Sequence, residues 1–563
     1  MKTNNGILQG YENTRLYRYD ELGADFPNSV TFNELPDRAV NGILKANRYV
    51  DGKLLQTYSQ GENHILTIAA TRLGKTTSCV IPQITSFAKQ QVKRSMIISD
   101  PKGELYRLLA ASLKDEGYDV FLFNLRDYSH SELWNPLTPI YKKFQRATNL
   151  ESEVEVVETK KGVRNKFQGV IYEKQSALDN AIAGMRNLLL ADVDSEIDKL
   201  MFTIIPHDDA RDQYWNEAPR QWGKANLWAM LEDSIPQEGK QKITEDTFSF
   251  NTMFTITDSL TEEDHYDNDN YFSGRGDESR AYKYARGVIE NASGTRQCVI
   301  SCFNAKVQAY RNSTIRLITG CSSFNMESLT SGKPTVVFIS YPDETKVYYQ
   351  VISTFVQSAY TYLINYANDQ PGGKLDVPFY FILDEFGNFP KIVDFDTVIS
   401  ACGGRNIWFD IVLQSYAQLD NVYGQNTAEI IRDNLNVHIF LGSNNPATLE
   451  LFSKECGNMT RISPRSALNG TKDEIEMYDI ETIPLVPKSM LASLKTGECI
   501  VTEANCGYVL FSKMERYYLC KEFTGFPLSY DKDYICPLNP LDKKYIYTFK
   551  GSRKVRGKYS IDF

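Results

Sequence analysis

The chain has 563 residues, more than one domain of roughly 100–200 residues, so two or three compact units are expected. A hydrophobic fraction of 42% and a charged fraction of 24% exclude a wholly disordered, collagen-like or coiled-coil protein. The net charge of -9 argues against a globally basic nucleic-acid coat but leaves room for a local basic groove or pore.

The amino-terminal segment, residues 1–50, contains no apolar stretch of the kind found in export signals. No run of about 18 apolar residues occurs in the chain, so we expect a cytoplasmic protein without a transmembrane helix. The ten cysteines include no C-x-x-C pair, which favours reduced and mostly buried thiols over a zinc site.

Short and nearly continuous apolar runs occur in two separated stretches of the chain. They lie at 64–69, 95–100, 119–125, 335–341, 379–385, 407–414 and 436–442. Runs of this kind are typical of parallel strands that are buried on both faces. Helical patterns at 102–116 and 347–368 alternate with them, so the sequence predicts an α/β fold with a predominantly parallel sheet.

The middle of the chain, residues 141–300, has a different character. Apolar residues recur at helical spacing in 173–190 and 212–233, and strand signals are few. We therefore expect a mainly helical, all-α domain that interrupts the α/β domain. The polar stretches 151–165 and 260–279 are expected to be mobile loops, and no spacing in the second matches a calcium loop.

A phosphate-binding loop is predicted after the first apolar run. Gly74, Lys75 and Thr76 stand in the strand–loop–helix context that such a loop requires. Lys75 would reach the β- and γ-phosphates of ATP, and the Thr76 hydroxyl would bind Mg²⁺. The usual first glycine is replaced by Ala69, which precedes the tight part of the loop, so we expect binding to survive. The predicted nucleotide-binding residues are Ala69, Thr71, Arg72, Gly74, Lys75 and Thr76.

Another apolar strand ends in the carboxylates of Asp384 and Glu385. In a P-loop sheet, Asp384 would join the magnesium shell and Glu385 would polarise the attacking water. Gln414 ends a further strand and fits a sensor role, because a neutral amide can bond both the γ-phosphate and that water. The alternative for the two acids is a structural one, in which they cap a strand or face solvent.

Further motifs accompany the loop and the acid-ended strand. They are 51–55 (DGKLL), 99–105 (SDPKGEL), 135–137 (NPL), 383–390 (LDEFGNFP), 413–419 (LQSYAQL) with 423–424 (YG), and 484–501. Together with 64–76, they resemble the motifs of type IV secretion coupling proteins of the TraG/TraD type, in the FtsK/HerA branch of RecA-like P-loop ATPases. The combination of D-P-K-G-E, L-D-E-F-G and L-Q-S-x-A-Q-L is highly specific.

The resemblance implies a RecA-like ATPase that forms a homo-hexameric ring at the inner face of the cell membrane. Such proteins use ATP and Mg²⁺ to deliver a relaxase–DNA complex or an effector protein to type IV secretion channel subunits. The helical domain would engage the relaxosome or the effector. Family members commonly carry transmembrane helices. Because 1–50 is polar, this chain would be recruited peripherally by a separate membrane-anchor subunit, or its anchor has been removed or is encoded elsewhere.

Several assignments stay open at this point. In a RecA-like ring a neighbour's arginine can stabilise the developing phosphoryl charge, and Arg405 is our catalytic candidate, with Arg296 and Arg432 as competitors. A solvated loop arginine is the alternative. Asp100 and Lys102 of the D-P-K-G-E motif either form a turn or contact nucleotide. Two other functions remain: a DNA-translocating ATPase outside conjugation, and a non-hydrolysing receptor, against which the retained acids argue.

The carboxyl-terminal segment, 521–563, reverses the sign of the overall charge. Its cations and rings are Lys543, Lys544, Tyr545, Tyr547, Phe549, Lys550, Arg553, Lys554, Arg556, Lys558 and Tyr559. Such a pattern suits single-stranded DNA without sequence specificity, or anionic lipid, and a solvated terminus is the alternative. The expected divisions of the chain are 1–50, 51–140, 141–300, 301–520 and 521–563.

Overall fold

The computed structural model describes residues 15–18, 27–37, 42–159, 162–207, 213–236, 242–261, 271–465, 477–525, 538–547, 550–552 and 560–562. The chain forms two compact units. Unit 1 comprises Met1–Leu122, Met326–Asp343 and Tyr360–Asp533, and unit 2 comprises Phe123–Asn325, Glu344–Ala359 and Tyr534–Phe563. The boundaries expected near 140 and 300 both fall inside the first segment of unit 2.

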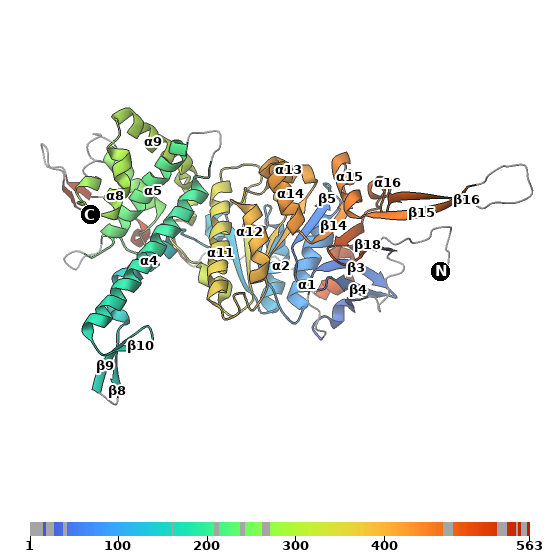
Figure 1. Ribbon diagram of the computed structural model, residues 1–563, viewed down its shortest axis with the longest axis horizontal. Helices are drawn as coiled ribbons and strands as arrows, with labels where there is room; N and C mark the ends of the chain where they lie inside the picture. Colours follow the sequence, from blue (N-terminus) through green and yellow to red (C-terminus); the bar gives the residue numbers. More distant parts are fainter. Residues whose placement is uncertain are drawn as a thin grey trace, which may run out of the picture. The chain divides into compact units, whose positions relative to one another are not determined.

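Unit 1 is built around a ten-stranded sheet (Figure 1). In spatial order its strands are β1 (Arg15–Arg18), β18 (Tyr508–Lys513), β17 (Glu498–Glu503), β14 (Val437–Gly442), β5 (Ile65–Ala69), β13 (Ile407–Leu413), β12 (Phe379–Leu383), β6 (Ser95–Ser99), β11 (Thr335–Ser340) and β7 (Asp119–Asn124). The six strands from β14 to β11 run parallel to one another. All seven predicted strands are present, which confirms the predicted α/β fold.

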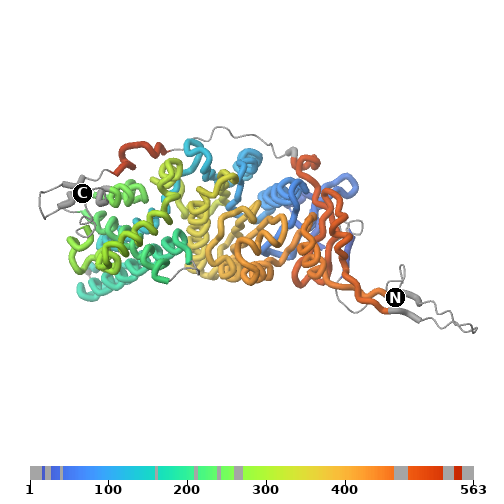
Figure 2. Tube along the Cα trace, turned by 90° about the horizontal axis from the view of Figure 1, so that it is seen from above, coloured from blue at the N-terminus to red at the C-terminus, as the bar shows by residue number. Residues whose placement is uncertain are grey.

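Two groups of helices cover the two faces of this sheet. On one face α1 (Ile81–Lys89) and α2 (Glu104–Asp115) share an apolar core with the strands, in which Phe87, Leu109 and Phe338 are fully buried. On the other face the stacked rings of Phe381 and Phe409 meet Phe395 of α12 (Phe395–Cys402). Figure 2 shows α1 and α2, in blue, opposite the orange α12, α13 (Tyr416–Tyr423) and α14 (Gln425–Asn434).

Three strands of the sheet were not predicted, and two of them bear on the site. β17 is antiparallel to β14, and β18 is antiparallel to β17. β18 therefore runs in the same direction as β5, and the segment that follows Lys513 leaves the sheet at the edge where β5 ends. The third, β1, pairs with β18 at the outer edge of the sheet.

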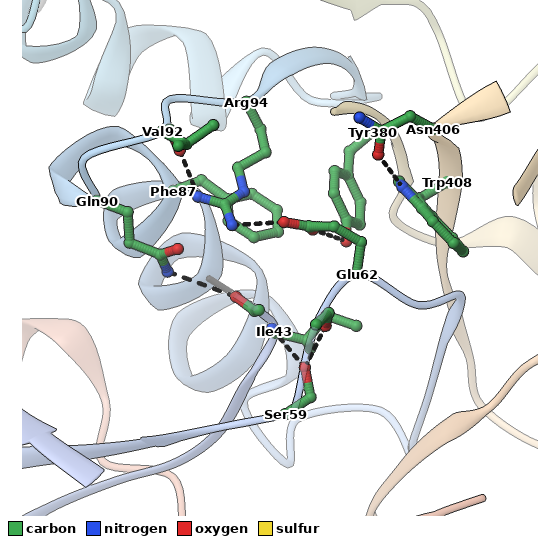
Figure 3. A network of polar contacts seen from close by, with 12 residues as sticks. Ile43, Ser59, Glu62, Phe87, Gln90, Val92, Arg94, Tyr380, Asn406 and Trp408 are labelled. Carbon is green, nitrogen blue, oxygen red and sulfur yellow. Dashed lines mark hydrogen bonds and ion pairs between the residues drawn. The ribbon is translucent and has the colours of Figure 1, made fainter. Parts of the chain in front are cut away.

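A buried polar network ties strands together at the opposite, amino-terminal edge of the sheet (Figure 3). The guanidinium of Arg94, whose side chain is 0% exposed, donates from Nη2 to Glu62 Oε1 at 2.5 Å. Tyr380 donates its hydroxyl to Glu62 Oε2 at 2.5 Å, and Arg94 also lies 5.2 Å from the centre of the Phe87 ring. Because a buried charge is costly unless it is paired, this network fixes the starts of β5, β6 and β12 relative to one another.

Smaller elements complete unit 1. A three-stranded sheet contains β2 (Ser29–Thr31), β4 (Lys53–Tyr58) and β3 (Leu44–Val50). α15 (Pro446–Glu455) and α16 (Lys488–Ala492) flank a hairpin of β15 (Asn458–Arg465) and β16 (Met477–Pro484), which projects from the unit (Figure 1).

Unit 2 is mainly helical, as the sequence predicted. Its helices include α3 (Thr138–Thr148), α4 (Gln175–Ile204), α5 (Gln213–Asp233), α6 (Phe250–Thr261), α8 (Arg280–Ile289), α9 (Ser293–Lys306) and α10 (Ser313–Ile318), while α11 (Tyr349–Asp369) begins in it. Short strands β19 (Lys550–Ser552) and β20 (Ser560–Asp562) pair near the carboxyl terminus. Within the described part of the chain, every helix is too short or too polar to cross a membrane.

The expectation of a mobile loop at 151–165 is wrong. This stretch contributes to a three-stranded antiparallel sheet of β8 (Glu155–Thr159), β9 (Gly162–Phe167) and β10 (Val170–Tyr172), at one end of α4 (Figure 1). Phe167 anchors the sheet, because it is buried with Leu150 and with Leu178 of α4. A single buried ring in an otherwise polar stretch gives little local signal for a strand.

Two other expectations for unit 2 need correction. In the stretch 260–279, residues 262–270 lie outside the described residues, but Phe272 is buried and Arg275 forms two bonds with the Asp233 carboxylate, at 2.9 and 2.7 Å. In the carboxyl-terminal segment, Tyr545 is buried, so its ring is not free to stack on bases. Burial and the nearby charge of Asp233 raise the pKa of Tyr547. Phe549, Arg553, Lys554, Arg556, Lys558 and Tyr559 lie outside the described residues.

Candidate nucleotide site

The predicted phosphate loop connects β5 to the helical turn η2 (Lys75–Val80), which continues into α1. Ala69 is the last residue of β5 and is fully buried in the core of the sheet. Its methyl group is therefore accommodated before the loop begins, which explains why alanine can stand at the first position. Gly74 has φ +90°, and a Cβ there would lie 3.1 Å from Thr77 Oγ1, so glycine is required at this second position. Arg72 is also left-handed, at φ 69°.

The structure brings the loop and the acid-ended strand β12 into direct contact. The Lys75 ammonium lies 3.2 Å from Glu385 Oε1 and 3.7 Å from Asp384 Oδ1. The Thr76 hydroxyl donates to Asp384 Oδ2 at 2.6 Å. These four residues come from the ends of β5 and β12, whose carboxyl ends meet at one edge of the sheet with only β13 between them. The four residues therefore form one polar cluster at the loop.

Local bonds hold the two acids in place. The backbone N–H of Glu385 donates to Asp384 Oδ1 at 2.8 Å, and Ser99 Oγ donates to the Asp384 carbonyl at 3.3 Å. Glu385 has φ 56°, a conformation that is uncommon for a residue other than glycine. This backbone turn comes two residues after Leu383, the last residue of β12, and directs the two adjacent carboxylates to the same loop.

Gln414 joins the cluster through Thr71, whose hydroxyl donates to Gln414 Oε1 at 3.2 Å. The backbone N–H of Gln414 donates to Gln418 Oε1 at 2.7 Å. The Gln418 amide also lies so close to Gly387 that any Cβ there would collide with it at 2.4 Å. Sequence reasoning missed this role of Gln418, although its position four residues after Gln414 in the LQSYAQL motif was a signal.

The oxygen donors at this cluster fit a magnesium ion. Mg²⁺ in nucleotide sites is held by one or two carboxylates together with substrate phosphates, and Asp384 and Thr76 present a carboxylate and a hydroxyl side by side. No group of three or more His, Cys, Asp or Glu suited to a metal occurs among the described residues. A site that shares its ion with phosphates needs no such group.

Arg405 lies apart from this cluster within the same chain. It precedes β13, whereas Gln414 follows β13, and seven strand residues at about 3.3 Å each separate the two by roughly 20 Å. Its Nε donates to Asn368 Oδ1 and its Nη1 to the Ala401 carbonyl, both at 3.0 Å. Figure 3 shows the next residue, Asn406, at the amino-terminal edge of the sheet. Arg405 therefore does not contact the nucleotide cluster of its own chain.

The competing arginines also have partners within the chain. Arg432 Nη1 donates to Asp420 Oδ1 at 2.8 Å. Arg296, in unit 2, donates to the Ile289 carbonyl at 3.1 Å.

The D-P-K-G-E motif has a structural explanation. Asp100 is buried and its Oδ2 accepts from the backbone N–H of Tyr106, in the first turn of α2, at 2.8 Å. Burial raises the pKa of Asp100 to about 6, while bonds from backbone N–H groups of that turn act in the opposite direction. This geometry favours the turn-forming alternative over a nucleotide contact. Lys102 is exposed.

A parallel sheet with a phosphate loop after one strand and paired acids after a neighbouring strand defines a P-loop nucleotide-binding protein. The family model described as "Type IV secretory system Conjugative DNA transfer" matches residues 33–500. The chain belongs to this family, which confirms the resemblance to coupling proteins.

Curated relatives agree with this assignment. VirD4 of Rhizobium rhizogenes is 22% identical over 404 residues, which cover 70% of this chain and 50% of that protein. VirD4 of Agrobacterium fabrum gives the same identity and coverage. TraG of Escherichia coli is 37% identical over 91 residues, 16% of this chain and 14% of TraG. The chain thus spans about half the length of the first two relatives.

Solved structures show the same fold at lower identity. The bacterial conjugative coupling protein TrwBdeltaN70, in complex with sulphate, superposes with a TM-score of 0.55 at 14% identity, over 80% of this chain and 85% of that one. TrwB in complex with a non-hydrolysable ATP analogue gives a TM-score of 0.54 at 13% identity, over 90% and 95% of the two chains. The mostly parallel sheet with a helical insert is therefore shared with TrwB.

Proposed function

We propose that this chain is the ATP-hydrolysing coupling protein of a type IV secretion system. It would deliver a relaxase–DNA complex or an effector protein to the secretion channel at the inner face of the membrane. The observation that carries the proposal is the contact of Lys75 and Thr76 with Asp384 and Glu385, in a chain of the conjugative DNA transfer family. The ATP analogue bound by TrwB supports ATP as the nucleotide.

Each residue of the cluster has a chemical role in this proposal. The loop N–H groups and the Lys75 ammonium bind the phosphates, and Thr76 with Asp384 would hold Mg²⁺. That ion, when bound, neutralises charge on the β- and γ-phosphate oxygens. Glu385 orients and polarises the attacking water. Gln414, held by Thr71, lies where a side-chain amide can respond to the γ-phosphate.

The Lys75–Glu385 ion pair adds a switching step to the hydrolysis. The Lys75 ammonium lies 3.2 Å from Glu385. It cannot keep this ion pair and also bind the phosphates. Phosphate binding therefore draws Lys75 from Glu385 and leaves that carboxylate free to accept a bond from water. The Glu385 carboxylate can therefore act as a general base only when the nucleotide is bound.

The partners in this proposal follow from the family. We infer a homo-hexamer when active, non-specific contact with single-stranded DNA, and contact of unit 2 with the relaxosome or an effector. Channel subunits receive the substrate, and a separate membrane-anchor subunit would hold the chain at the membrane.

Two substitutions test the ATPase assignment. Lys75→Ala removes a charge-assisted phosphate contact and should weaken ATP binding about 10- to 100-fold. Glu385→Gln should bind ATP normally and lower turnover by about 10²–10⁴, the usual contribution of a general base. Calorimetric titration measures ATP binding, and phosphate release with and without single-stranded DNA measures turnover. The exposed residues Lys495→Ala and Glu429→Gln are the matched controls. Parental turnover in Glu385→Gln would make the catalytic assignment wrong.

A further inference from the structure

A second cation lies against the phosphate loop, on the side away from the two acids. A Cβ at Gly74 would lie 3.4 Å from Arg516 Nε, as well as 3.2 Å from Ser78 Oγ. Arg516 belongs to the segment that follows β18, three strands from β5 on the side opposite to β12. The loop is therefore flanked by the acids on one side and by Arg516 on the other.

Two buried polar atoms at this point have no partner within the part of the chain that the structure describes. They are Arg516 Nε and Ser78 Oγ. Ser78 is 0% exposed, so neither solvent nor a phosphate oxygen reaches its hydroxyl until the side chains around the loop move apart. Buried donors that lack an acceptor are costly, and both of these lie beside the glycine of a phosphate-binding loop. Together they indicate an anionic oxygen as the missing acceptor.

The backbone around Arg516 is held in place independently of any ligand. The N–H of Glu515 donates to the Asn47 carbonyl at 2.8 Å, and Asn47 Nδ2 donates to the Glu515 carbonyl at 3.3 Å. The Arg516 side chain donates from Nη1 to the Tyr518 hydroxyl at 2.7 Å. No carboxylate pairs with Arg516 in the described residues, so its charge is available to a ligand.

We propose that Arg516 and Ser78 bind the α-phosphate end of the nucleotide, with Tyr518 positioning the guanidinium. This inference rests on the proposed function, because it takes the γ-phosphate to lie beside Lys75, Asp384 and Glu385. A polyphosphate chain that runs along the loop from these acids has its nucleoside end on the side of Arg516. Arginine suits this task because its planar fork presents several N–H donors to phosphate oxygens.

A contact between Arg516 and the α-phosphate predicts how substitutions of Arg516 change the affinities for ADP and for an ATP analogue. Arg516→Ala should weaken binding of ADP and of the ATP analogue ADPNP by the same factor, about 10- to 100-fold, because both carry the α-phosphate. Arg516→Lys should recover part of the loss. Tyr518→Phe should weaken ADP binding less, and should cost nothing further in the Arg516→Ala background. Calorimetric titration of the full chain measures each affinity, with the exposed Arg461→Ala as the matched control.

The outcomes separate this inference from the proposed function. If the parent chain binds neither nucleotide, the proposed function fails. If the parent binds and Lys75→Ala does not, while Arg516→Ala binds both nucleotides like the parent, the function stands and the Arg516 inference is overturned. A loss confined to ADPNP would place Arg516 at the γ-phosphate and would also overturn it. The thermal midpoint without nucleotide guards against misfolding, since Arg516→Lys and Arg461→Ala should melt like the parent.

Discussion

Asp410 makes the stability of unit 1 depend on pH. It lies in the middle of β13, is 4% exposed, and its Oδ1 has no partner among the described residues. Burial, and then the charge of Asp384, raise its pKa to about 8 from 3.8. Cys79 is the other titratable group that faces it, and burial raises the pKa of that thiol well above its usual value, so the thiol stays neutral in this range.

The direction in which the free energy of unfolding changes with pH follows from proton binding to Asp410 in the folded and unfolded chains. Between about pH 4 and pH 8 the folded chain keeps the Asp410 proton and the unfolded chain has lost it, so the free energy of unfolding falls as pH rises. One pKa unit corresponds to about 1.4 kcal/mol, and half of the protons have left the folded state at pH 8, so roughly 2 kcal/mol is lost between pH 6 and pH 8. Asp410→Asn cannot ionise and should remove this loss.

Thermal unfolding at pH 6 and pH 8 measures the effect. Asp410→Asn should melt near the parental midpoint at pH 6 and several degrees above it at pH 8, at about 2–4 °C per kcal/mol. The exposed Asp433→Asn is the matched control and should follow the parent at both values. If the parent and Asp410→Asn lose stability equally between the two pH values, the buried carboxyl is not the cause.

Two further predictions concern assembly and DNA. Mixing Arg405→Ala subunits with Lys75→Ala subunits should restore part of an ATPase activity that each lacks alone, because a trans-acting arginine contributes about 10³–10⁵ in rate; no recovery at any ratio counts against Arg405. Deleting 543–563 should weaken binding of single-stranded DNA and flatten its salt dependence, by about 0.7 in slope for each phosphate that the segment neutralises. Equal affinity and slope in the truncated chain, for DNA and for anionic vesicles, would mean that the segment contacts neither.

The large sheet was predictable because its central strands are buried on both faces. Strand 379–383 is apolar at every position and strand 95–99 at its three central positions, whereas a strand with one solvated face would alternate apolar and polar residues. Strands β8 to β10 were not predicted because they are half-exposed, with Val156 at 70% exposure, and because polar residues interrupt their apolar residues. Their stability depends on Phe167 reaching α4, a contact that no local pattern reveals.

The candidate site also contains residues whose position could be predicted from the sequence and one whose position could not. The meeting of Lys75 with Asp384 and Glu385 could be anticipated, because the carboxyl ends of parallel strands share one edge. Arg516 could not be anticipated. Its approach to Gly74 depends on the β17–β18 hairpin, which turns the chain back to the same edge at the far side of the sheet. An arginine far from the loop in the sequence, and outside any motif, cannot be assigned to the site until the strand order is known.

In the proposed function, the strand order gives the two ends of the nucleotide different supports in the fold. The γ-phosphate side depends on β12, whose start is fixed by the Glu62, Arg94 and Tyr380 network at the opposite edge of the sheet. The α-phosphate side depends on the segment after β18, which is held by bonds between Asn47 and Glu515. Because β3 and β18 belong to the periphery and β12 to the centre, we expect a movement of the periphery to alter nucleotide binding without displacing Asp384 and Glu385, the acids proposed to act in hydrolysis.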